Sequence, residues 1–501
     1  MTIDAPAPLN LAAALLEPNL AQHPHKTAYV CNGEMVSYQQ LAVGACRFAA
    51  WLQQAGITAG DRVLLILPDS PVCIAAFLGT VLQGAVAVPV NTTLTADEYR
   101  YIQEDCAARF LLVSASVPAA LELAPSGVTR LVCPEQLHGW LEEYLPVTLA
   151  APPPPAEAFA FMLYTSGSTG KPKGVPHRHH DLLTAAQQYG KGVLRISSDD
   201  VLFSSSKLSF AYGLGNSLAF PLYAGATALL HPGKPTPDDL LALIEKHRPS
   251  LFFSVPTVYS QIILRVTSPR LSLPMRLCIA AGEALPSAIF DEWQRLTGLE
   301  LLDGIGSTEA THIFISNYPG RSRSGSAGQL VPGYEARLVD DDGTAVAPGS
   351  PGHLLIRGNS LASCYWNLPH KTTATMLPDG FIRTGDIFVE QEGYFYHRGR
   401  SDDMLKAGGQ WISPIQVEEA IRTHPAVADC AVAACHVVGL ERPAAWLVLK
   451  QDVTPQAGFE RELRRFLAPL LAEHMLPVKV HLVEDLPRTA TGKVQRFKLK
   501  S

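Results

Sequence analysis

One segment, residues 164–174, limits what this chain can fold into. It reads YTSGSTGKPKG, so eleven residues contain four Ser/Thr hydroxyls, three glycines and two lysines. The apolar run 159–163 precedes it and predicts a strand that ends in this loop. Flexible backbone N–H groups, hydroxyl donors and two cations in one small volume are what a polyphosphate requires. We therefore interpret the segment as a phosphate-binding loop.

A solvated surface turn is the alternative, because Gly and Ser dominate turns for local reasons. An ordinary P-loop is not present. Counting the P-loop pattern from Gly167, the second glycine position is Pro172, and Lys171 is followed by proline instead of Ser or Thr. A phosphate-binding role for this loop therefore requires a fold other than that of the P-loop NTPases.

Strand and helix patterns alternate on both sides of this loop. Apolar positions at helical spacing predict helices at 38–55, 72–82 and 237–247, and short apolar runs predict strands at 62–67, 86–90, 110–113, 226–230, 251–254 and 277–281. A further helix is predicted over 181–189, capped by Asp181. This alternation favours an α/β fold with mostly parallel sheets and helices on their faces. Shorter β-like segments with turns predict a β-rich subdomain over 325–358.

The clearest domain boundary lies near 400–403. Beyond it, the pattern predicts helices at 414–422 and 459–471 and strands at 427–434, 445–449 and 478–482. This is enough for a small α/β domain. We therefore expect two domains, residues 1–401 and residues 402–501.

Composition excludes several classes of protein. With 501 residues and 47% hydrophobic side chains, the chain is long enough for more than one core. The net charge of −6, without a block of like charges, argues against nucleic acid or an anionic membrane as partner. The longest apolar region, 72–90, is interrupted by polar residues, glycines and a proline, which argues against a membrane-spanning helix. The first ten residues lack a signal-peptide pattern, which argues against export. Nine cysteines without a C-x-x-C pair are typical of reduced thiols, so we expect a cytoplasmic protein.

Residues 164–174 resemble, letter for letter, the signature loop of the adenylate-forming superfamily of acyl-CoA synthetases, adenylation domains and luciferases. The resemblance extends from about residue 11 to residue 498, with several motifs in the expected order. It implies a large N-terminal adenylation domain and a small mobile C-terminal domain. It also implies that the loop grips the β- and γ-phosphates of ATP through Thr165, Ser166, Gly167, Ser168, Thr169, Gly170 and Lys173.

Two further segments match the nucleotide site of that superfamily. In DGIGSTE, residues 303–309, the resemblance implies that Thr308 contacts the α-phosphate and that Glu309 holds Mg²⁺, a cation that prefers carboxylate and phosphate oxygens. Without the resemblance, the alternative interpretation of residues 303–309 is a turn with a solvated glutamate. The adenine-facing residues implied by the resemblance are Gly282, Glu283, Ala284, Asp303, Gly304 and Ile305. Ile305 replaces the aromatic residue that most members carry, so the contact with adenine becomes apolar.

FIRTGD, at 381–386, supplies the carboxylate that the superfamily uses to bind both ribose hydroxyls. Asp386 can accept two hydrogen bonds at once, which suits a cis-diol, although a solvated turn aspartate is the alternative. The family spacing adds Arg400 as a second ribose contact and Asp402 as the hinge. Lys406, Gly408 and Gly409 then correspond to the flexible segment that lies beside coenzyme A after the small domain rotates.

The segment PRTATGK ends in Lys493, which we identify as the main catalytic candidate. A carboxylate that attacks the α-phosphate of ATP brings two anions together, and one ammonium group between them supplies positioning and charge neutralisation. Without context a lysine near the chain end is a solvated surface charge. Agreement with the family motif at several other places favours the catalytic role.

The acyl pocket implied by the resemblance lies in the segment 207–218 together with Ile305, Gly306 and His312. Amino-acid-activating relatives place an aspartate in this segment, whereas this chain has Phe210, Ala211, Tyr212 and Gly213 there. A buried ammonium group without a partner would be costly, so the substrate should lack an α-amino group. FAYGLGN and GIGSTE are similar to benzoate-CoA ligases and favour a flat aryl acid. His312 is either a polar handle for a ring substituent or a packed core histidine.

These inferences predict an ATP- and Mg²⁺-dependent aryl-CoA ligase that forms an acyl-adenylate and then an acyl-CoA thioester, with benzoate or a hydroxy- or aminobenzoate as substrate. A second hypothesis delivers the acyl group to the phosphopantetheine thiol of a carrier protein instead of coenzyme A. A third, from another class, is a nucleotide- or acyl-binding protein without catalysis, although Lys493, Glu309 and Asp386 argue against it. The expected oligomeric state is a monomer or homodimer.

Overall fold

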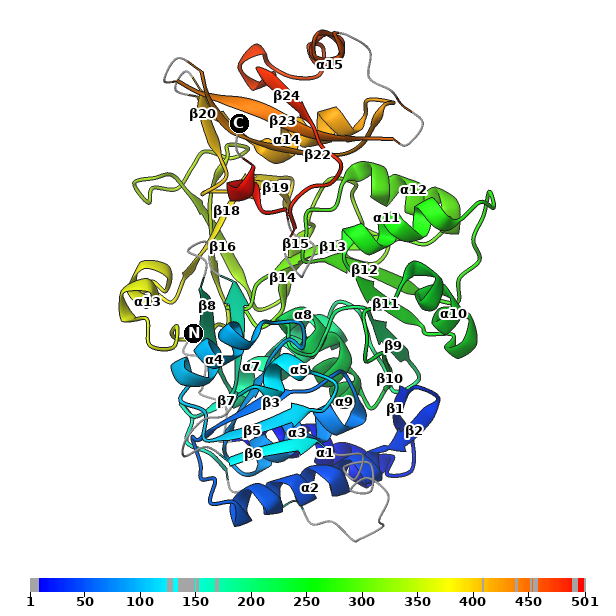
Figure 1. The fold of residues 1–501 in the computed structure, drawn as a ribbon, viewed down its shortest axis with the longest axis vertical. Coiled ribbons are helices and arrows are strands. Elements are labelled where there is room, and N and C mark those ends of the chain that lie inside the picture. Colours follow the sequence, from blue (N-terminus) through cyan, green and yellow to red (C-terminus); the bar gives the residue numbers. More distant parts are fainter. Residues whose placement is uncertain are drawn as a thin grey trace.

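The computed structural model describes residues 9–123, 129–133, 149, 153–166, 171–407, 410–437, 440–450, 453, 458–488 and 494–499. Within these ranges the strands form two large sheets in the first part of the chain, one four-stranded sheet next to them, and two small sheets in the last hundred residues (Figure 1). The α/β prediction is confirmed.

The larger sheet has nine strands and a parallel centre. In spatial order it contains β15 (Gln329–Leu330), β14 (Ile313–Ser316), β13 (Leu301–Gly306), β12 (Leu277–Ala281), β11 (Leu251–Ser254), β9 (Val201–Ser204), β10 (Thr227–Leu230), β1 (Thr27–Cys31) and β2 (Glu34–Ser37). The strands from β13 to β1 pair in parallel, and antiparallel pairs close both edges. Central strands such as β11 and β12 are buried along their whole length, as expected for strands covered on both faces.

The second sheet has six strands and the same mostly parallel character. Its order is β6 (Thr129–Cys133), β5 (Phe110–Ser114), β3 (Arg62–Ile66), β4 (Val86–Pro89), β7 (Phe159–Ser166) and β8 (Pro172–Arg178). Only the last pair, β7 with β8, is antiparallel. The predicted phosphate loop therefore connects the two strands of a hairpin at the edge of this sheet.

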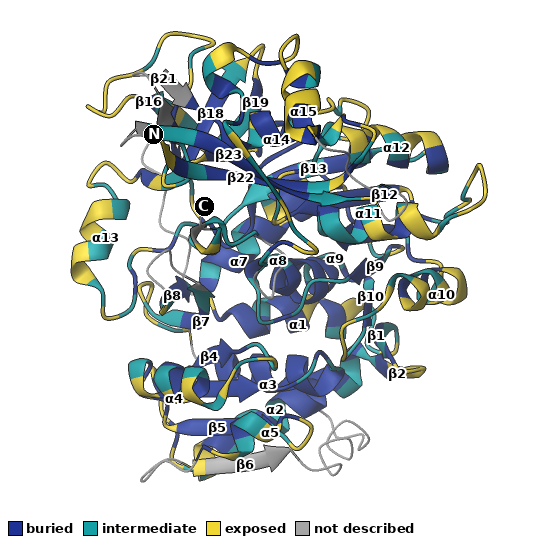
Figure 2. Cartoon of the chain, turned by 45° about the horizontal axis from the view of Figure 1, so that its top comes forward, coloured by how far each residue is buried: buried dark blue, intermediate teal, exposed yellow. Residues whose placement is uncertain are grey.

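Helices fill the space between the two large sheets and cover their outer faces. One core joins both sheets through α1 (Leu11–Gln22), α2 (Tyr38–Gln54), α3 (Pro71–Leu82), α7 (His179–Ala185) and α9 (Phe220–Ala224). A second core packs α10 (Pro237–His247), α11 (Pro256–Arg265) and α12 (Ser287–Thr297) on the nine-stranded sheet, and a third packs α4 (Ala96–Asp105) and α5 (Pro118–Leu121) on the six-stranded sheet. Figure 2 shows the continuous burial of the central helices.

Local sequence signals explain where the central helices begin. Ser37 caps α2 in a capping box with Gln40, and Ser70 accepts a hydrogen bond from the backbone of Cys73 at the start of α3. All twelve residues of α3 are buried, which explains why its sequence is apolar on every side.

The prediction of a helix over 181–189 needs a correction. α7 begins two residues earlier, at His179, and is followed by the π-helical segment η2 (Ala186–Lys191). Asp181 lies inside the first turn, where its carboxylate accepts hydrogen bonds from the Arg178 backbone and from His177.

The predicted β-rich region is a four-stranded antiparallel sheet that continues beyond residue 358. It contains β16 (Glu335–Val339), β17 (Gly352–Arg357), β18 (Ile382–Gln391) and β19 (Tyr394–Arg400), with α13 (Pro369–Thr375) between β17 and β18. β19 ends directly before the segment 401–403.

The last hundred residues form a separate cluster of elements, at the top of Figure 1. They are β20 (Leu405–Ala407), β21 (Gln410–Ile412), α14 (Pro414–Arg422), β22 (Val427–Val437), β23 (Leu440–Leu449), α15 (Phe459–Leu467), η4 (Glu473–Met475), β24 (Lys479–Leu482) and η5 (Arg496–Lys498). α14 and α15 pack on the sheet β22–β23–β24 around a core of their own. No helix within the described ranges is long and apolar enough to cross a membrane.

Candidate active site

The two strands of the 164–174 hairpin are described, and its tip, 167–170, lies outside the described residues. Thr165 pairs with Lys173 and Tyr164 with Gly174 across the hairpin. The hydroxyl of Tyr164 donates a hydrogen bond of 2.6 Å to the carboxylate of Asp105 at the end of α4. The hairpin is therefore fixed at its base. The predicted contacts of Gly167, Ser168, Thr169 and Gly170 stay predictions.

Lys173 and Glu309 lie close together, although they are far apart in the sequence. The Nζ of Lys173 is 3.9 Å from Oε1 of Glu309 and lies over the ring of Tyr365, 4.4 Å from its centre. The Tyr365 hydroxyl donates a 2.6 Å hydrogen bond to the same carboxylate oxygen. Burial lowers the pKa of Lys173, and the positive charges of Lys371 and Arg400 lower it further, against the attraction of Glu309. The positive charges of Lys173, Lys371 and Arg400 together favour the binding of an anion.

Glu309 and Thr308 follow β13, and the loop that carries them is attached to the start of α7. Nε2 of the buried His177 lies 2.9 Å from the carbonyl oxygen of Thr308, and its Nδ1 lies 3.1 Å from the carboxylate of Asp181. The backbone oxygen of Glu309 also accepts a hydrogen bond from Ala362. The loop is thus fixed at both of the predicted catalytic residues.

The predicted adenine-facing residues occupy the ends of two adjacent parallel strands. β12 ends at Ala281, and Gly282 follows with a φ of +94°, a left-handed conformation that favours glycine. The carboxylate of Glu283 accepts hydrogen bonds from the backbone and the hydroxyl of Thr257. On the neighbouring strand β13, Asp303 pairs with Ala280, and burial raises the pKa of its carboxyl group well above the usual range. Ligands of open α/β sheets bind at such carboxyl ends of strands.

Asp386 and Arg400 face each other across the β18–β19 pair. Nη1 of Arg400 lies 3.3 Å from Oδ1 of Asp386 and donates a 2.8 Å hydrogen bond to the carbonyl oxygen of Thr384. Nε2 of His397 lies 3.3 Å from the same carboxylate oxygen. The structure therefore brings the two predicted ribose-binding residues together and adds a histidine to them.

The predicted acyl-pocket residues also converge. Phe210 precedes the short helix α8 (Ala211–Leu214), and the backbone oxygen of Tyr212 lies 3.3 Å from Nε2 of His312. Oδ1 of Asn216, in the π-helical turn η3 (Gly215–Ala219), lies 3.2 Å from the same nitrogen. Because both neighbours are acceptors, Nε2 carries the proton.

His312 is buried and packs between aromatic rings, 4.6 Å from the ring centre of Phe220 and 5.5 Å from that of Tyr189. Burial lowers its pKa to about 3, so the ring is neutral at physiological pH. Glycines leave room for it: a Cβ added to Gly215 would lie 2.3 Å from its Cδ2, and one added to Gly306 would lie 2.4 Å from its backbone oxygen.

The remaining predicted residues lie in the last part of the chain. Asp402 is exposed and lies one residue beyond the Ser401 that follows β19, and the backbone of Lys406 lies in β20. Gly408, Gly409 and Lys493 lie outside the described residues. Arg496 contacts Asp403 at 3.3 Å and both carboxylate oxygens of Glu418 at 2.8 and 3.0 Å. The last described segment is thereby attached to the start of this part of the chain.

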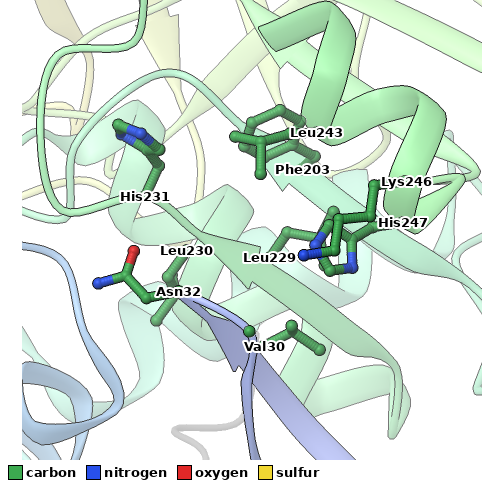
Figure 3. A pocket seen from close by; sticks show the side chains of 10 residues that line it. Val30, Asn32, Phe203, Leu229, Leu230, His231, Leu243, Lys246 and His247 are labelled. Atoms are coloured by element: carbon green, nitrogen blue, oxygen red, sulfur yellow. The ribbon is translucent and has the colours of Figure 1, made fainter. Parts of the chain in front are cut away.

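Sequence reasoning missed several residues of this site. Tyr365, His177 and His397 contact predicted residues across sequence separations of 56, 131 and 11. The cluster HRHH at 177–180 was the one visible signal, since four consecutive polar residues span the end of β8 and the start of α7. The small pocket of Figure 3 lies elsewhere, against β1, β10 and α10, and none of its lining residues was predicted to act.

Comparison with known proteins identifies the class to which this fold and site belong. Residues 16–366 match the family of AMP-binding enzymes, and residues 416–493 match the C-terminal domain of AMP-binding enzymes. The chain therefore belongs to the AMP-binding enzyme family, and the predicted adenylate-forming superfamily is confirmed.

Within that family, the similarity is to aryl-CoA ligases. The chain is 40% identical to benzoate–CoA ligase of Thauera aromatica, over 100% of this chain and 97% of that protein. A benzoate CoA ligase structure from Burkholderia xenovorans LB400 matches with a TM-score of 0.90 and 39% identity, covering 98% of this chain and all of that one. A structure of an anthranilate CoA ligase in complex with anthranoyl-AMP matches with a TM-score of 0.92 and 37% identity, covering 99% and 97% of the two chains.

Proposed function

We propose that this protein is an AMP-forming aryl-CoA ligase. A carboxylate oxygen of the aryl acid attacks the α-phosphate of ATP and pyrophosphate leaves. The thiol of coenzyme A, as thiolate, then attacks the acyl carbon and AMP leaves, so that an acyl-CoA thioester remains. The observation that carries this proposal is the full-length similarity to benzoate–CoA ligase of Thauera aromatica. ATP, Mg²⁺ and coenzyme A are cytoplasmic compounds, so the proposal includes a cytoplasmic location.

In the first half-reaction, Lys493 would lie between the carboxylate and the α-phosphate and neutralise both. The hairpin residues, with Lys173, would bind the β- and γ-phosphates, which leave as pyrophosphate. Thr308 would contact the α-phosphate. The close approach of Lys173 to Glu309, 3.9 Å, supports one shared phosphate site for the hairpin and the loop after β13.

The residues present fit a Mg²⁺ ion that is bound mainly by substrate. No group of three or more His, Cys, Asp or Glu side chains that could hold a metal occurs in the described part of the chain. Mg²⁺ usually takes one or two carboxylates and the phosphates of its nucleotide. Glu309 would hold the ion, which would supply charge neutralisation on the phosphate oxygens.

The nucleoside would lie along the strand ends described above. Gly282, Glu283 and Ala284 would face the adenine from one side, and Asp303, Gly304 and Ile305 from the other. Asp386 and Arg400 would bind the ribose hydroxyls. The proximity of Asp386 to Arg400 supports this role, because hydrogen bonds that involve a carboxylate or a guanidinium group are stronger than those between neutral groups.

For the second half-reaction, we propose that residues 402–501 act as a mobile domain that rotates about Asp402 relative to residues 1–401. The rotation would exchange Lys493 for Lys406, Gly408 and Gly409 beside the reacting atoms. An exposed Asp402 in the short segment that follows β19 supports this hinge position.

The acyl substrate follows from the pocket. Phe210, Ala211, Tyr212 and Gly213, with Ile305, Gly306 and the neutral His312, offer apolar and aromatic surface without a charged partner for an α-ammonium group. We therefore propose benzoate or a hydroxy- or aminobenzoate. Nδ1 of His312 is buried and has no hydrogen-bond partner among the described residues, so it can accept a hydrogen bond from a ring substituent.

A pyrophosphate-release assay with benzoate, its hydroxy and amino derivatives, cinnamates and short fatty acids tests this function. We expect activity with benzoates and its loss, by at least a hundredfold, in Lys493→Ala. Preference for a fatty acid would refute the aryl pocket, and unchanged pyrophosphate release in Lys493→Ala would refute the assignment of the catalytic lysine.

The acyl acceptor needs its own test, because delivery to a carrier protein uses the same first half-reaction. We expect thioester on free coenzyme A in a product analysis by mass spectrometry. Thioester only on a phosphopantetheinylated carrier protein would instead support the carrier hypothesis.

A further inference from the structure

A buried carboxylate outside the site described above, Asp69, is attached to the segment that carries the acyl pocket. Asp69 follows strand β3 of the six-stranded sheet and is 6% exposed. Its Oδ1 accepts a 3.1 Å hydrogen bond from the backbone N–H of Leu208. This bond joins residues 139 positions apart and connects the end of β3 in the six-stranded sheet to the loop after β9 of the nine-stranded sheet.

The neighbouring residue, Lys207, fixes the same loop from its other side. Its Nζ donates a 2.6 Å hydrogen bond to the carbonyl oxygen of His231, which follows β10. Lys207 also attracts the Asp69 carboxylate. Burial raises the pKa of Asp69 to about 6, and the positive charge of Lys207 limits that rise. Two consecutive residues are thus attached to two different sheets.

The turn between Lys207 and the pocket has little freedom to adjust. The backbone N–H of Phe210 donates to the carbonyl oxygen of Lys207 at 3.0 Å. A Cβ added to Gly213 would lie 2.1 Å from that same oxygen, so the chain folds back closely on Lys207. A shift of Lys207 or Leu208 must therefore move Phe210 and Gly213 with it.

The far end of this turn carries the aromatic wall of the pocket. Tyr212 donates a hydrogen bond to the carbonyl oxygen of Ile279 at 3.2 Å, and its own backbone oxygen lies 3.3 Å from Nε2 of His312. The turn thus has one attachment at Asp69 and another at Tyr212, with Phe210, Ala211 and Gly213 between them.

We infer that Asp69 is a positioning residue for the aryl acid, holding the 207–213 turn so that Tyr212 and His312 present a fixed pocket to the substrate. This inference rests on the proposed aryl-CoA ligase function. It places a specificity determinant directly beyond β3 of the six-stranded sheet, outside every motif that identifies the family. In this role Asp69 would act on the substrate only through the turn.

The experiment compares Asp69→Ala and Asp69→Asn with a control at the opposite end of the same strand. Asp61 precedes β3, is 8% exposed and also accepts a backbone hydrogen bond, from Thr58 at 2.8 Å. Asp61→Ala therefore removes a comparable buried carboxylate far from the turn. KM for the aryl acid and KM for ATP are measured for each variant, together with hydrogen exchange of the 207–213 backbone.

We expect Asp69→Ala to raise KM for the aryl acid about tenfold, the effect of one lost hydrogen bond, while KM for ATP changes less than about twofold. Asp69→Asn keeps an acceptor oxygen for the Leu208 N–H and should raise KM for the aryl acid about threefold or less. Exchange of the 207–213 segment should become faster in Asp69→Ala and stay at the wild-type rate in Asp61→Ala. Should Asp69→Ala fail to fold, Lys207→Met, which removes both the hydrogen bond to His231 and the positive charge that attracts Asp69, must raise KM for the aryl acid and leave KM for ATP unchanged.

An unchanged KM for the aryl acid in Asp69→Ala, or equal changes in both KM values, would overturn the inference. A wild-type protein without activity on any aryl acid would instead refute the proposed function. The exchange measurement separates the two cases, because it shows whether Asp69 holds the turn without any assay of catalysis.

Discussion

Acidification should destabilise the protein through His312. The imidazole is 2% exposed, its Nε2–H faces the acceptors Asn216 and Tyr212, and burial lowers its pKa to about 3 from an ordinary value of 6.5. In the unfolded chain the same side chain binds a proton near pH 6.5. Between these two values the unfolded state therefore holds one proton more than the folded state, and folding becomes less favourable as the pH falls.

The size of the effect follows from the pKa difference. Each pH unit below 6.5 costs about 1.4 kcal/mol of unfolding free energy, hence about 1.4 kcal/mol at pH 5.5 and about 2.7 kcal/mol at pH 4.5. His179, whose pKa burial lowers to about 4, adds a similar loss. Asp69 has the opposite effect on stability. Burial raises its pKa to about 6, so the folded state binds a proton at a higher pH than the unfolded state, and acidification favours folding at this residue.

A substitution isolates the contribution of His312 from these others. In His312→Gln the amide nitrogen keeps a donor near Asn216, but no group titrates. We expect urea unfolding followed by intrinsic fluorescence to show that the variant loses about 1.4 kcal/mol less than the wild type between pH 7.5 and 5.5. Tyr189→Phe, which removes a hydroxyl from a ring 5.5 Å away, disturbs the same core and should keep the wild-type pH dependence.

The change in unfolding free energy with pH, compared among the two variants and the wild type, tests whether burial of His312 causes the effect. Equal slopes for His312→Gln and the wild type, within about 0.5 kcal/mol over two pH units, would mean that the folded state accepts the proton on His312 and that the reasoning from burial is wrong. A flattened slope in Tyr189→Phe would mean that core loosening, and not the lost titration, changes the pH dependence.

Three further predictions concern the site. Tyr365→Phe removes the 2.6 Å hydrogen bond that orients Glu309 and should raise the Mg²⁺ concentration for half-maximal pyrophosphate release about tenfold, whereas removal of an exposed tyrosine hydroxyl should not. Asp386→Asn keeps the shape of the side chain but removes its charge and should raise KM for ATP about tenfold with little change in KM for the aryl acid; equal changes would contradict a ribose contact. Gly215→Ala places a Cβ 2.3 Å from the ring of His312 and should lower stability by about 1–3 kcal/mol in thermal unfolding, so an unchanged transition would show that the ring can move away.

The sequence predicted those features that local patterns determine. Period and turn residues located α3, the parallel strands and the four-stranded region, because burial of a helix or strand face leaves a local trace. The family motifs were predicted to form one nucleotide site, and the structure brings Glu309 of one motif to within 3.9 Å of Lys173 of another. Family resemblance supplied the order of the motifs, which periodicity alone does not contain.

Contacts between distant segments could not be predicted in this way. Tyr365 orients Glu309 from a segment with no recognisable pattern, and Asp69 reaches Leu208 across two sheets. Such contacts depend on how helices and sheets pack in three dimensions, and a single sequence carries no direct record of that packing. The start of α7 was misplaced by two residues because Asp181 accepts a backbone hydrogen bond from inside the first turn instead of from the capping position.

The position of β1 in the nine-stranded sheet has a consequence for synthesis of the protein on the ribosome. β1 pairs with β10, and the hydroxyl of Thr227 donates a hydrogen bond to the carbonyl oxygen of Thr27, 200 residues earlier. At about 5–20 residues per second, the first strand must wait about 10–40 s for its neighbour to emerge. During that interval its apolar face and one unpaired edge are available to other chains. Slower translation of residues 31–227 should therefore lower the soluble yield, and chaperones that cover exposed strands should restore it.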